Sequence, residues 1–319
     1  MERDLFQAFN ARTGGLLPPA LRTMSVLVVG AGSVGSQMVD GLVRSGVGSV
    51  TIVDGDSVEA HNLSRSVYVS SHIGRPKAEC LAGHARMINS GVEAAWIDRP
   101  LQAIERLALA TIVATSDLII GATDDPDAQV KLNRIAHHHK KSAIFVGLYK
   151  GAKGGEVVVS VPGVTPCFEC FSGAKRIPAG NGGNIHRSRD YGSGRLEGEV
   201  GLGADITHVT SAATKIALAI LSAMTCEPGK AREFGLRMLE ERLTVATFGM
   251  EPDYWFFPRV LAQAAGQFAF QSVWLEVATN DDCPGCSKRD PGDPIWTMTG
   301  PIDQGQFNFQ ADITEEIPA

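Results

Sequence analysis

The chain has 319 residues and a formal net charge of −6, so its overall charge gives no sign of a surface that binds DNA or RNA. Hydrophobic residues make up 44% and charged residues 20% of the sequence, which is ordinary for a globular protein with a full core. We find no apolar run of the roughly 18 residues that a membrane helix needs, and no secretory signal at the N-terminus. We therefore expect a cytoplasmic protein.

From residue 25 onward, short apolar runs alternate with segments of helical spacing. The runs predict strands at 25–29, 50–53, 94–97, 118–121 and 143–149, and the spacing predicts helices at 36–44, 77–89 and 127–139. Strands that alternate with helices are typical of a parallel sheet covered on both faces. The pattern predicts a Rossmann-like, doubly wound α/β fold with a mostly parallel sheet.

The second half of the chain has a different pattern. Strands are predicted at 156–161, 243–248 and 273–279, a helix at 206–223, and a long loop rich in glycine and charge at 172–203. We divide the chain into an N-terminal extension at 1–22, a nucleotide-binding domain at 23–165, and a region at 166–319 that contains the loop, the helix and antiparallel strands that would dock a substrate.

A glycine-rich turn lies between the first predicted strand and the first predicted helix. Gly30, Gly32 and Gly35 form the pattern G-x-G-x-x-G, which allows a tight turn and a close approach of the backbone to phosphate. Asp54 ends the next strand, where a carboxylate can bond ribose hydroxyl groups. These features predict a nucleotide site and, taken alone, mildly favour NAD over ATP.

The residues that follow resemble the ThiF, MoeB and ubiquitin-activating family. The family pattern D-x-D-x-V-x-x-x-N-L-x-R is matched by residues 54–65. Residues 74–78 are similar to its G-x-x-K-A, and residues 154–170 to its G-x-V followed by P-G-x-T-P-C-x-x-C. Residues 122–125 are similar to its C-T-D-N, and Asn133 to the asparagine that follows that motif downstream. Such ordered motifs cover roughly residues 26–170, and the resemblance resumes at 206–286.

The resemblance implies ATP-dependent adenylation, with release of pyrophosphate, of the C-terminal carboxylate of a ubiquitin-like or sulfur-carrier protein, or of a peptide. It implies a homodimer, a bacterial conjugation or peptide-modification pathway, and a downstream conjugating protein as a further partner. Arg65 and Lys77 would meet the phosphates, and Asp124 would hold Mg²⁺. The expected nucleotide-binding residues are Gly30, Gly32, Gly35, Asp54, Asp56 and Asn62. Read singly, Arg65 and Lys77 could be solvated charges, and Asp124 a helix cap.

Two C-x-x-C pairs lie far apart in the sequence. They consist of Cys167 with Cys170 and Cys283 with Cys286. Four thiolates in two such pairs predict a closed, tetrahedral, structural Zn²⁺ site that attaches the C-terminal segment to the region after the main sheet. Redox dithiols or simple buried cysteines are the alternative.

The chain also departs from the family pattern. The loop at 172–203 has no cysteine that could form a thioester, and the N-terminus has no R-x-x-R-Q stretch. Gln129 stands where the family usually has arginine. A nucleophilic role for Ser188, Ser193 or Cys226 is open but not favoured. Two other functions remain as alternatives: a catalytically silent scaffold subunit and an NAD-dependent oxidoreductase.

Overall fold

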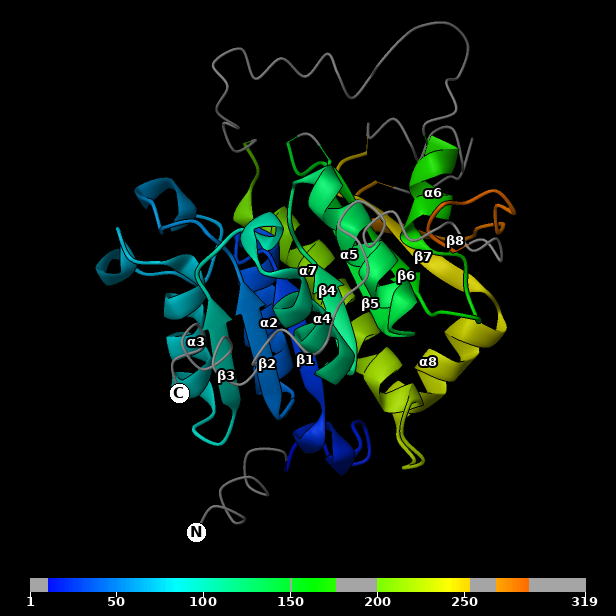
Figure 1. Ribbon diagram of the computed structural model, residues 1–319, viewed down its shortest axis with the longest axis horizontal. Coiled ribbons are helices and arrows are strands. Elements are labelled where there is room, and N and C mark those ends of the chain that lie inside the picture. The colour runs from blue at the N-terminus through cyan, green and yellow to red at the C-terminus, as the bar shows by residue number, and fades with distance from the viewer. Residues whose placement is uncertain (1–10, 150, 176–199, 253–267, 287–319) are drawn as a thin grey trace, which may run out of the picture.

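A computed structural model describes residues 11–149, 151–175, 200–252 and 268–286. Its strands form one sheet in the order β3-β2-β1-β4-β5-β6-β7-β8, which crosses the molecule from β3 at one side to β8 at the other (Figure 1). The strands are β1 Ser25–Val29, β2 Ser49–Val53, β3 Glu93–Ile97, β4 Leu118–Gly121, β5 Ser142–Leu148, β6 Gly154–Ser160, β7 Leu243–Gly249 and β8 Gln271–Glu276.

The sheet has a parallel half and an antiparallel half. Strands β3, β2, β1, β4 and β5 pair in parallel, while β6, β7 and β8 continue the sheet in antiparallel pairs. Parallel pairing brings the carboxyl ends of β1, β2 and β4 to one edge of the sheet. The predicted α/β fold, with a mostly parallel sheet and antiparallel strands toward the C-terminus, is confirmed.

Helices cover both faces of this sheet. They are α2 Ser33–Arg44, α3 Lys77–Ile88, α4 Arg106–Thr115, α5 Pro126–His138, α6 Phe168–Lys175, α7 Gly203–Ala223 and α8 Lys230–Glu240, and the short 3₁₀ turns are η1 Pro19–Thr23, η2 Ala60–Asn62, η3 Ser70–His72 and η4 Leu101–Ala103. Val26 and Val28 of β1 join a core with α2, α3, α7 and α8. Leu27 and Val29 join a second core with α4, α5 and α6. The alternation along one strand therefore produces the doubly wound arrangement.

Helix α7 corrects one expectation from the sequence. Its 21 residues are long and apolar enough to cross a membrane by length and composition, although we expected no such run. However, 67% of the apolar window is buried inside the fold, where α7 packs on α2, α8, β5 and β6. The core helix of a globular domain has the same properties, so this one helix is weak evidence for a membrane span.

Other differences concern helices that the sequence pattern did not reveal. Helix α4 (RLALATIVAT) is apolar on nearly every side, so it lacks the contrast between faces that marks an amphipathic helix. Helix α6 occupies 168–175, so the predicted loop at 172–203 begins later than expected, and 176–199 lie outside the described residues. The division of the chain at 22 and 165 stays a prediction, and the single sheet continues across the second boundary.

Candidate functional site

The predicted nucleotide-binding residues gather at the carboxyl edge of β1, β2 and β4. The glycine turn follows β1, Asp54 follows β2, and 122–124 follow β4. Lys77 comes to the same edge as the first residue of α3, next to the loop that leaves β2. Ligands of open α/β sheets bind outside the carboxyl ends of the strands. The fold thus brings residues from four separate segments to the place where a nucleotide would bind.

The three glycines of the turn have different surroundings. Gly30 has a φ of +98°, and a Cβ at this position would lie 2.6 Å from the carbonyl oxygen of Ala122. A Cβ on Gly35 would clash with the carbonyl oxygen of Gly30. In contrast, a Cβ on Gly32, the N-cap of α2, would meet no protein atom within 4 Å. Gly30 and Gly35 are therefore needed for backbone packing, and Gly32 is the position where a ligand can approach.

The Asp54 carboxylate joins the glycine turn to the loop after β2. Its Oδ2 accepts a hydrogen bond from the Ala31 N–H at 2.6 Å, and its Oδ1 accepts one from the Asp56 N–H at 2.8 Å. Burial raises the pKa of Asp54, while the Ala31 hydrogen bond and the charge of Lys77 oppose this rise. Each oxygen can accept a second hydrogen bond, which leaves an acceptor for a ribose hydroxyl group. Ribose binding by Asp54 stays a prediction.

Lys77 is held by Asp56 at two points. The Lys77 N–H donates to the Asp56 carbonyl oxygen at 2.8 Å, and the Lys77 Nζ lies 2.8 Å from Asp56 Oδ2. The Lys77 side chain is 12% exposed and that of Asp56 is 74% exposed. An arriving phosphate group would therefore compete with a solvated carboxylate for a largely buried ammonium group. Phosphate binding by Lys77 and nucleotide binding by Asp56 stay predictions.

Asn62 organises the turn that leads to Arg65. Its Oδ1 accepts a hydrogen bond from the Glu59 N–H at 2.8 Å, and its carbonyl oxygen accepts one from the Arg65 N–H at 3.2 Å. Gln37 of α2 donates to the Arg65 carbonyl oxygen at 3.1 Å. These bonds attach the half-buried Arg65 to the helix that begins at the glycine turn. The phosphate contacts expected of Asn62 and Arg65 are not tested by this geometry.

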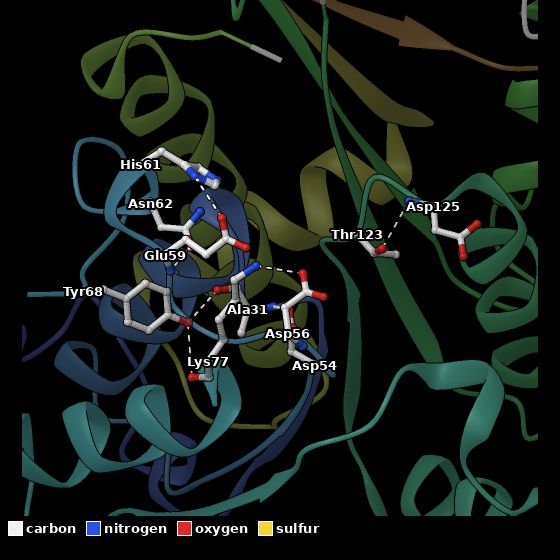
Figure 2. A network of polar contacts seen from close by, with 10 residues as sticks. All are labelled: Ala31, Asp54, Asp56, Glu59, His61, Asn62, Tyr68, Lys77, Thr123 and Asp125. Atoms are coloured by element: carbon white, nitrogen blue, oxygen red, sulfur yellow. Dashed lines mark hydrogen bonds and ion pairs between the residues drawn. The ribbon is translucent and has the colours of Figure 1, made fainter. Parts of the chain in front are cut away.

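Sequence reasoning missed Tyr68, which connects the glycine turn to Lys77. Its buried hydroxyl group donates to the carbonyl oxygen of Ala31 at 2.6 Å and faces that of Lys77 at 3.2 Å (Figure 2). Burial raises the pKa of Tyr68, so the hydroxyl group keeps its proton. None of the motifs matched in the sequence covers this position, and the signal there is a tyrosine within a short apolar stretch.

Two adjacent aspartates divide the roles that the sequence left open for Asp124. Asp125 is the N-cap of α5, since its Oδ1 accepts from the N–H groups of Asp127 and Ala128 at 2.9 and 3.3 Å. Asp124 is exposed, and its side chain makes no hydrogen bond or ion pair with any residue that the structure describes. The capping role belongs to Asp125, and metal binding by Asp124 stays a prediction.

The four paired cysteines converge into one cluster. The Cys167 Sγ lies 3.5 Å from that of Cys283 and 4.0 Å from that of Cys170, and the Cys170 Sγ lies 3.3 Å from that of Cys286. All four sulfur atoms lie within 4.8 Å of one another. A tetrahedral zinc site with Zn–S bonds of about 2.3 Å would place sulfur atoms about 3.8 Å apart. The cluster, almost entirely buried, could hold zinc.

The structure also places some of the residues at which the sequence departs from the family pattern. Cys226 is exposed, whereas Cys80, the other cysteine outside the cluster, is buried in α3. Gln129, in the usual arginine position, donates to the carbonyl oxygen of Thr123 at 2.7 Å and so supports the turn before α5. Ser188 and Ser193 lie outside the described residues.

Comparison with known proteins identifies the family. A model of the ThiF family matches residues 11–247. The chain belongs to the ThiF family. The SAMP-activating enzyme E1 of Haloferax volcanii is 32% identical over 153 residues, which are 47% of this chain and 54% of that protein. The adenylyltransferase and sulfurtransferase MOCS3 of Arabidopsis thaliana is 32% identical over 148 residues, which are 46% of this chain and 31% of that protein.

This ThiF-family chain thus spans about half or less of the length of these curated relatives. Among solved structures, E. coli MccB with ATP has a TM-score of 0.58 at 16% identity, over 84% of this chain and 68% of that chain. PaaA has a TM-score of 0.54 at 18% identity, over 81% of this chain and 65% of that chain. At such identities the likeness shows the fold alone.

The Tyr68→Phe substitution tests the link between the glycine turn and Lys77. It keeps the ring but removes the hydroxyl group, so the buried Ala31 carbonyl loses its hydrogen bond and the partly buried Lys77 carbonyl loses its contact. We expect a loss of unfolding free energy of about 1–3 kcal/mol, measured by urea denaturation. Val69→Ala, at a neighbour that is 52% exposed, is the control and should change stability by less than about 0.5 kcal/mol. A Tyr68→Phe variant as stable as the parent would contradict the link.

The cysteine cluster makes a prediction about metal content. Elemental analysis of the purified protein should find about one zinc ion per chain, and Cys283→Ser should remove most of it. Cys226→Ser, at the exposed cysteine outside the cluster, should keep the metal. A folded protein that contains no metal would show that the cluster is not a zinc site.

Proposed function

We propose that this chain uses ATP to adenylate the C-terminal carboxylate of a ubiquitin-like or carrier protein, or of a peptide. The observation that carries this proposal is the meeting of the glycine turn, Lys77 and the segment of Asp124 at one sheet edge. A phosphate-binding backbone, a cation and a free carboxylate are the groups that nucleotide activation requires. We also propose that the chain forms a homodimer in the bacterial cytoplasm. There it would act in a pathway with a downstream conjugating protein.

The proposed reaction needs no covalent help from the protein. A carboxylate oxygen of the substrate would form a bond to the α-phosphorus of ATP, and the bond from this phosphorus to the bridging β-phosphate oxygen would break. The electron pair would leave with pyrophosphate. Catalysis then consists of aligning the two reactants and offsetting the negative charge that accumulates between them.

Each residue would contribute through its observed position. The N-terminus of α2 at Gly32 would receive phosphate oxygens, because a helix N-terminus favours anions. Lys77 would exchange its contact with Asp56 for a phosphate group, and Arg65 would add a second positive charge. Asp124 would hold Mg²⁺, which would neutralise charge on the phosphate oxygens. Asp54 has lone pairs left for a ribose hydroxyl group.

The named relatives support the class of substrate. One is an activating enzyme and another is an adenylyltransferase, while MccB has been crystallised with ATP and, in a separate complex, with N-formylated MccA. These proteins point to a carboxylate-bearing protein or peptide as substrate. Because this chain covers only part of the curated relatives, we extend their shared activation step to it and not their further activities.

The Asp124→Ala substitution tests the proposal through pyrophosphate exchange into ATP. The assay would use magnesium and the small proteins or peptides encoded beside this gene. We expect the parent chain to catalyse exchange and Asp124→Ala to lose at least about 100-fold of it, because the metal supplies several kcal/mol of charge stabilisation.

Asp127→Ala is the matched control, since Asp127 is an exposed carboxylate in the first turn of the same helix. It should keep the exchange activity of the parent. Full activity in Asp124→Ala would remove the metal assignment. If the parent binds ATP but exchanges with no candidate, a scaffold subunit becomes the better explanation.

A further inference from the structure

Asn133 lies in α5 with its side chain entirely buried. Its Nδ2 donates to the Cys167 Sγ at 3.5 Å and to the Glu169 Oε1 at 3.1 Å. Its Oδ1 accepts from the Phe168 N–H at 3.1 Å. Both donor hydrogens and the carbonyl oxygen of the amide are therefore engaged by the turn that contains the first cysteine pair.

The next residue of α5 holds the same turn by charge. Arg134 donates from Nε and Nη2 to the two carboxylate oxygens of Glu169 at 2.9 and 2.8 Å. The Glu169 side chain is only 9% exposed, and it lies between Cys167 and Cys170 in the sequence. A buried carboxylate beside four cysteines, which would be thiolates when they hold zinc, needs compensation by donors and positive charge. Asn133 and Arg134 supply it from consecutive positions of one helix.

The second cysteine pair packs against the same side chain. Gly285 lies between Cys283 and Cys286, and a Cβ at this position would lie 2.7 Å from Asn133 Nδ2 and 2.7 Å from Glu169 Oε1. A side chain at this position would therefore have to displace the Asn133 amide or the Glu169 carboxylate. The two cysteine pairs are more than 100 residues apart in the sequence, and the turns of both pairs pack against the Asn133 side chain.

We propose that Asn133 couples the metal site to α5, so that Zn²⁺ binding at the four cysteines fixes the helix that follows Asp124. A metal-bound thiolate accepts a stronger N–H···S hydrogen bond than a thiol does, and donors to metal ligands commonly tune metal affinity. Asn133 is thus a positioning residue that holds both the cysteine turn and the helix. The consequence for Mg²⁺ and ATP at Asp124 rests on the proposed function, but the coupling itself does not.

The first test measures zinc retention in the full chain. Asn133→Asp keeps the acceptor for the Phe168 N–H but replaces the donor to Cys167 by a carboxylate oxygen. We expect zinc affinity to fall about 10–100-fold, measured by competition with a chromogenic chelator. Ser160→Ala is the matched control, because it removes the 3.0 Å contact of His137 on the same helix and leaves the Asn133 contacts in place. Its zinc affinity should equal that of the parent.

The second test measures hydrogen exchange of 122–134 by mass spectrometry, without ATP. Removing zinc from the parent should accelerate exchange in this segment at least severalfold, while β1 stays protected. Asn133→Asp with zinc bound should already exchange at the fast rate. If this variant does not fold, the shorter Asn133→Ser serves in both tests with the same expected results.

Zinc affinity within twofold of the parent in the variant, or exchange of 122–134 that does not respond to zinc removal, would overturn the coupling. Neither measurement depends on adenylation. A chain that couples zinc to α5 but never exchanges pyrophosphate would refute the proposed function alone.

Discussion

The proposed nucleotide site, at the carboxyl edge of β1, β2 and β4, depends on the hydrogen bonds that the Asp54 carboxylate accepts. This carboxylate accepts the N–H groups of Ala31 and Asp56 and so joins the turn after β1 to the loop after β2. From Asp56 the connection continues to the Lys77 ammonium group, and from Ala31 it continues through its carbonyl oxygen to Tyr68. A carboxylate this buried costs desolvation free energy, and the backbone donors and nearby cation offset it. The loops at the proposed nucleotide site are thereby held in place without a bound ligand.

The cysteine cluster is a second fixed point, which contacts the second half of α5 through Asn133. It brings together two turns that are far apart in the sequence and attaches them to Asn133 and Arg134. Helix α5 therefore has a capped start at Asp125 and an anchored second half. Asp124, the residue proposed to hold Mg²⁺, directly precedes this helix. A helix held at both positions would keep its carboxylate in a constant place, and small displacements of aligned groups are costly in catalysis.

The sequence predicts the fold where local pattern determines it. Strands β1 and β4 have the predicted bounds, because strands buried on both faces are continuous apolar runs bounded by polar or glycine residues. Helix α4 escaped detection because it is apolar on nearly every side. The glycine turn and the cysteine pairs were recognisable because their spacing is itself the chemical requirement.

The site could be predicted only in outline. Two consecutive aspartates follow β4, and sequence alone did not tell which one caps α5; the structure shows Asp125 in that role. Asn133 matches the asparagine downstream of the C-T-D-N motif, and Tyr68 lies outside the matched motifs. Their contacts reach residues that are 34 and 37 positions away, and no local pattern encodes such contacts. Burial gives their polar groups partners that sequence spacing does not reveal.

The central claim is that a substrate carboxylate attacks the α-phosphorus of ATP, and isotope transfer tests it most directly. The substrate's C-terminal carboxylate would be labelled with ¹⁸O, and the products of a reaction carried through hydrolysis or transfer of the adenylate would be analysed by mass spectrometry. The account predicts that one labelled oxygen appears in AMP. Label in inorganic phosphate, or AMP without label, would contradict it, because either result would mean that the bond to the α-phosphorus does not form from the carboxylate.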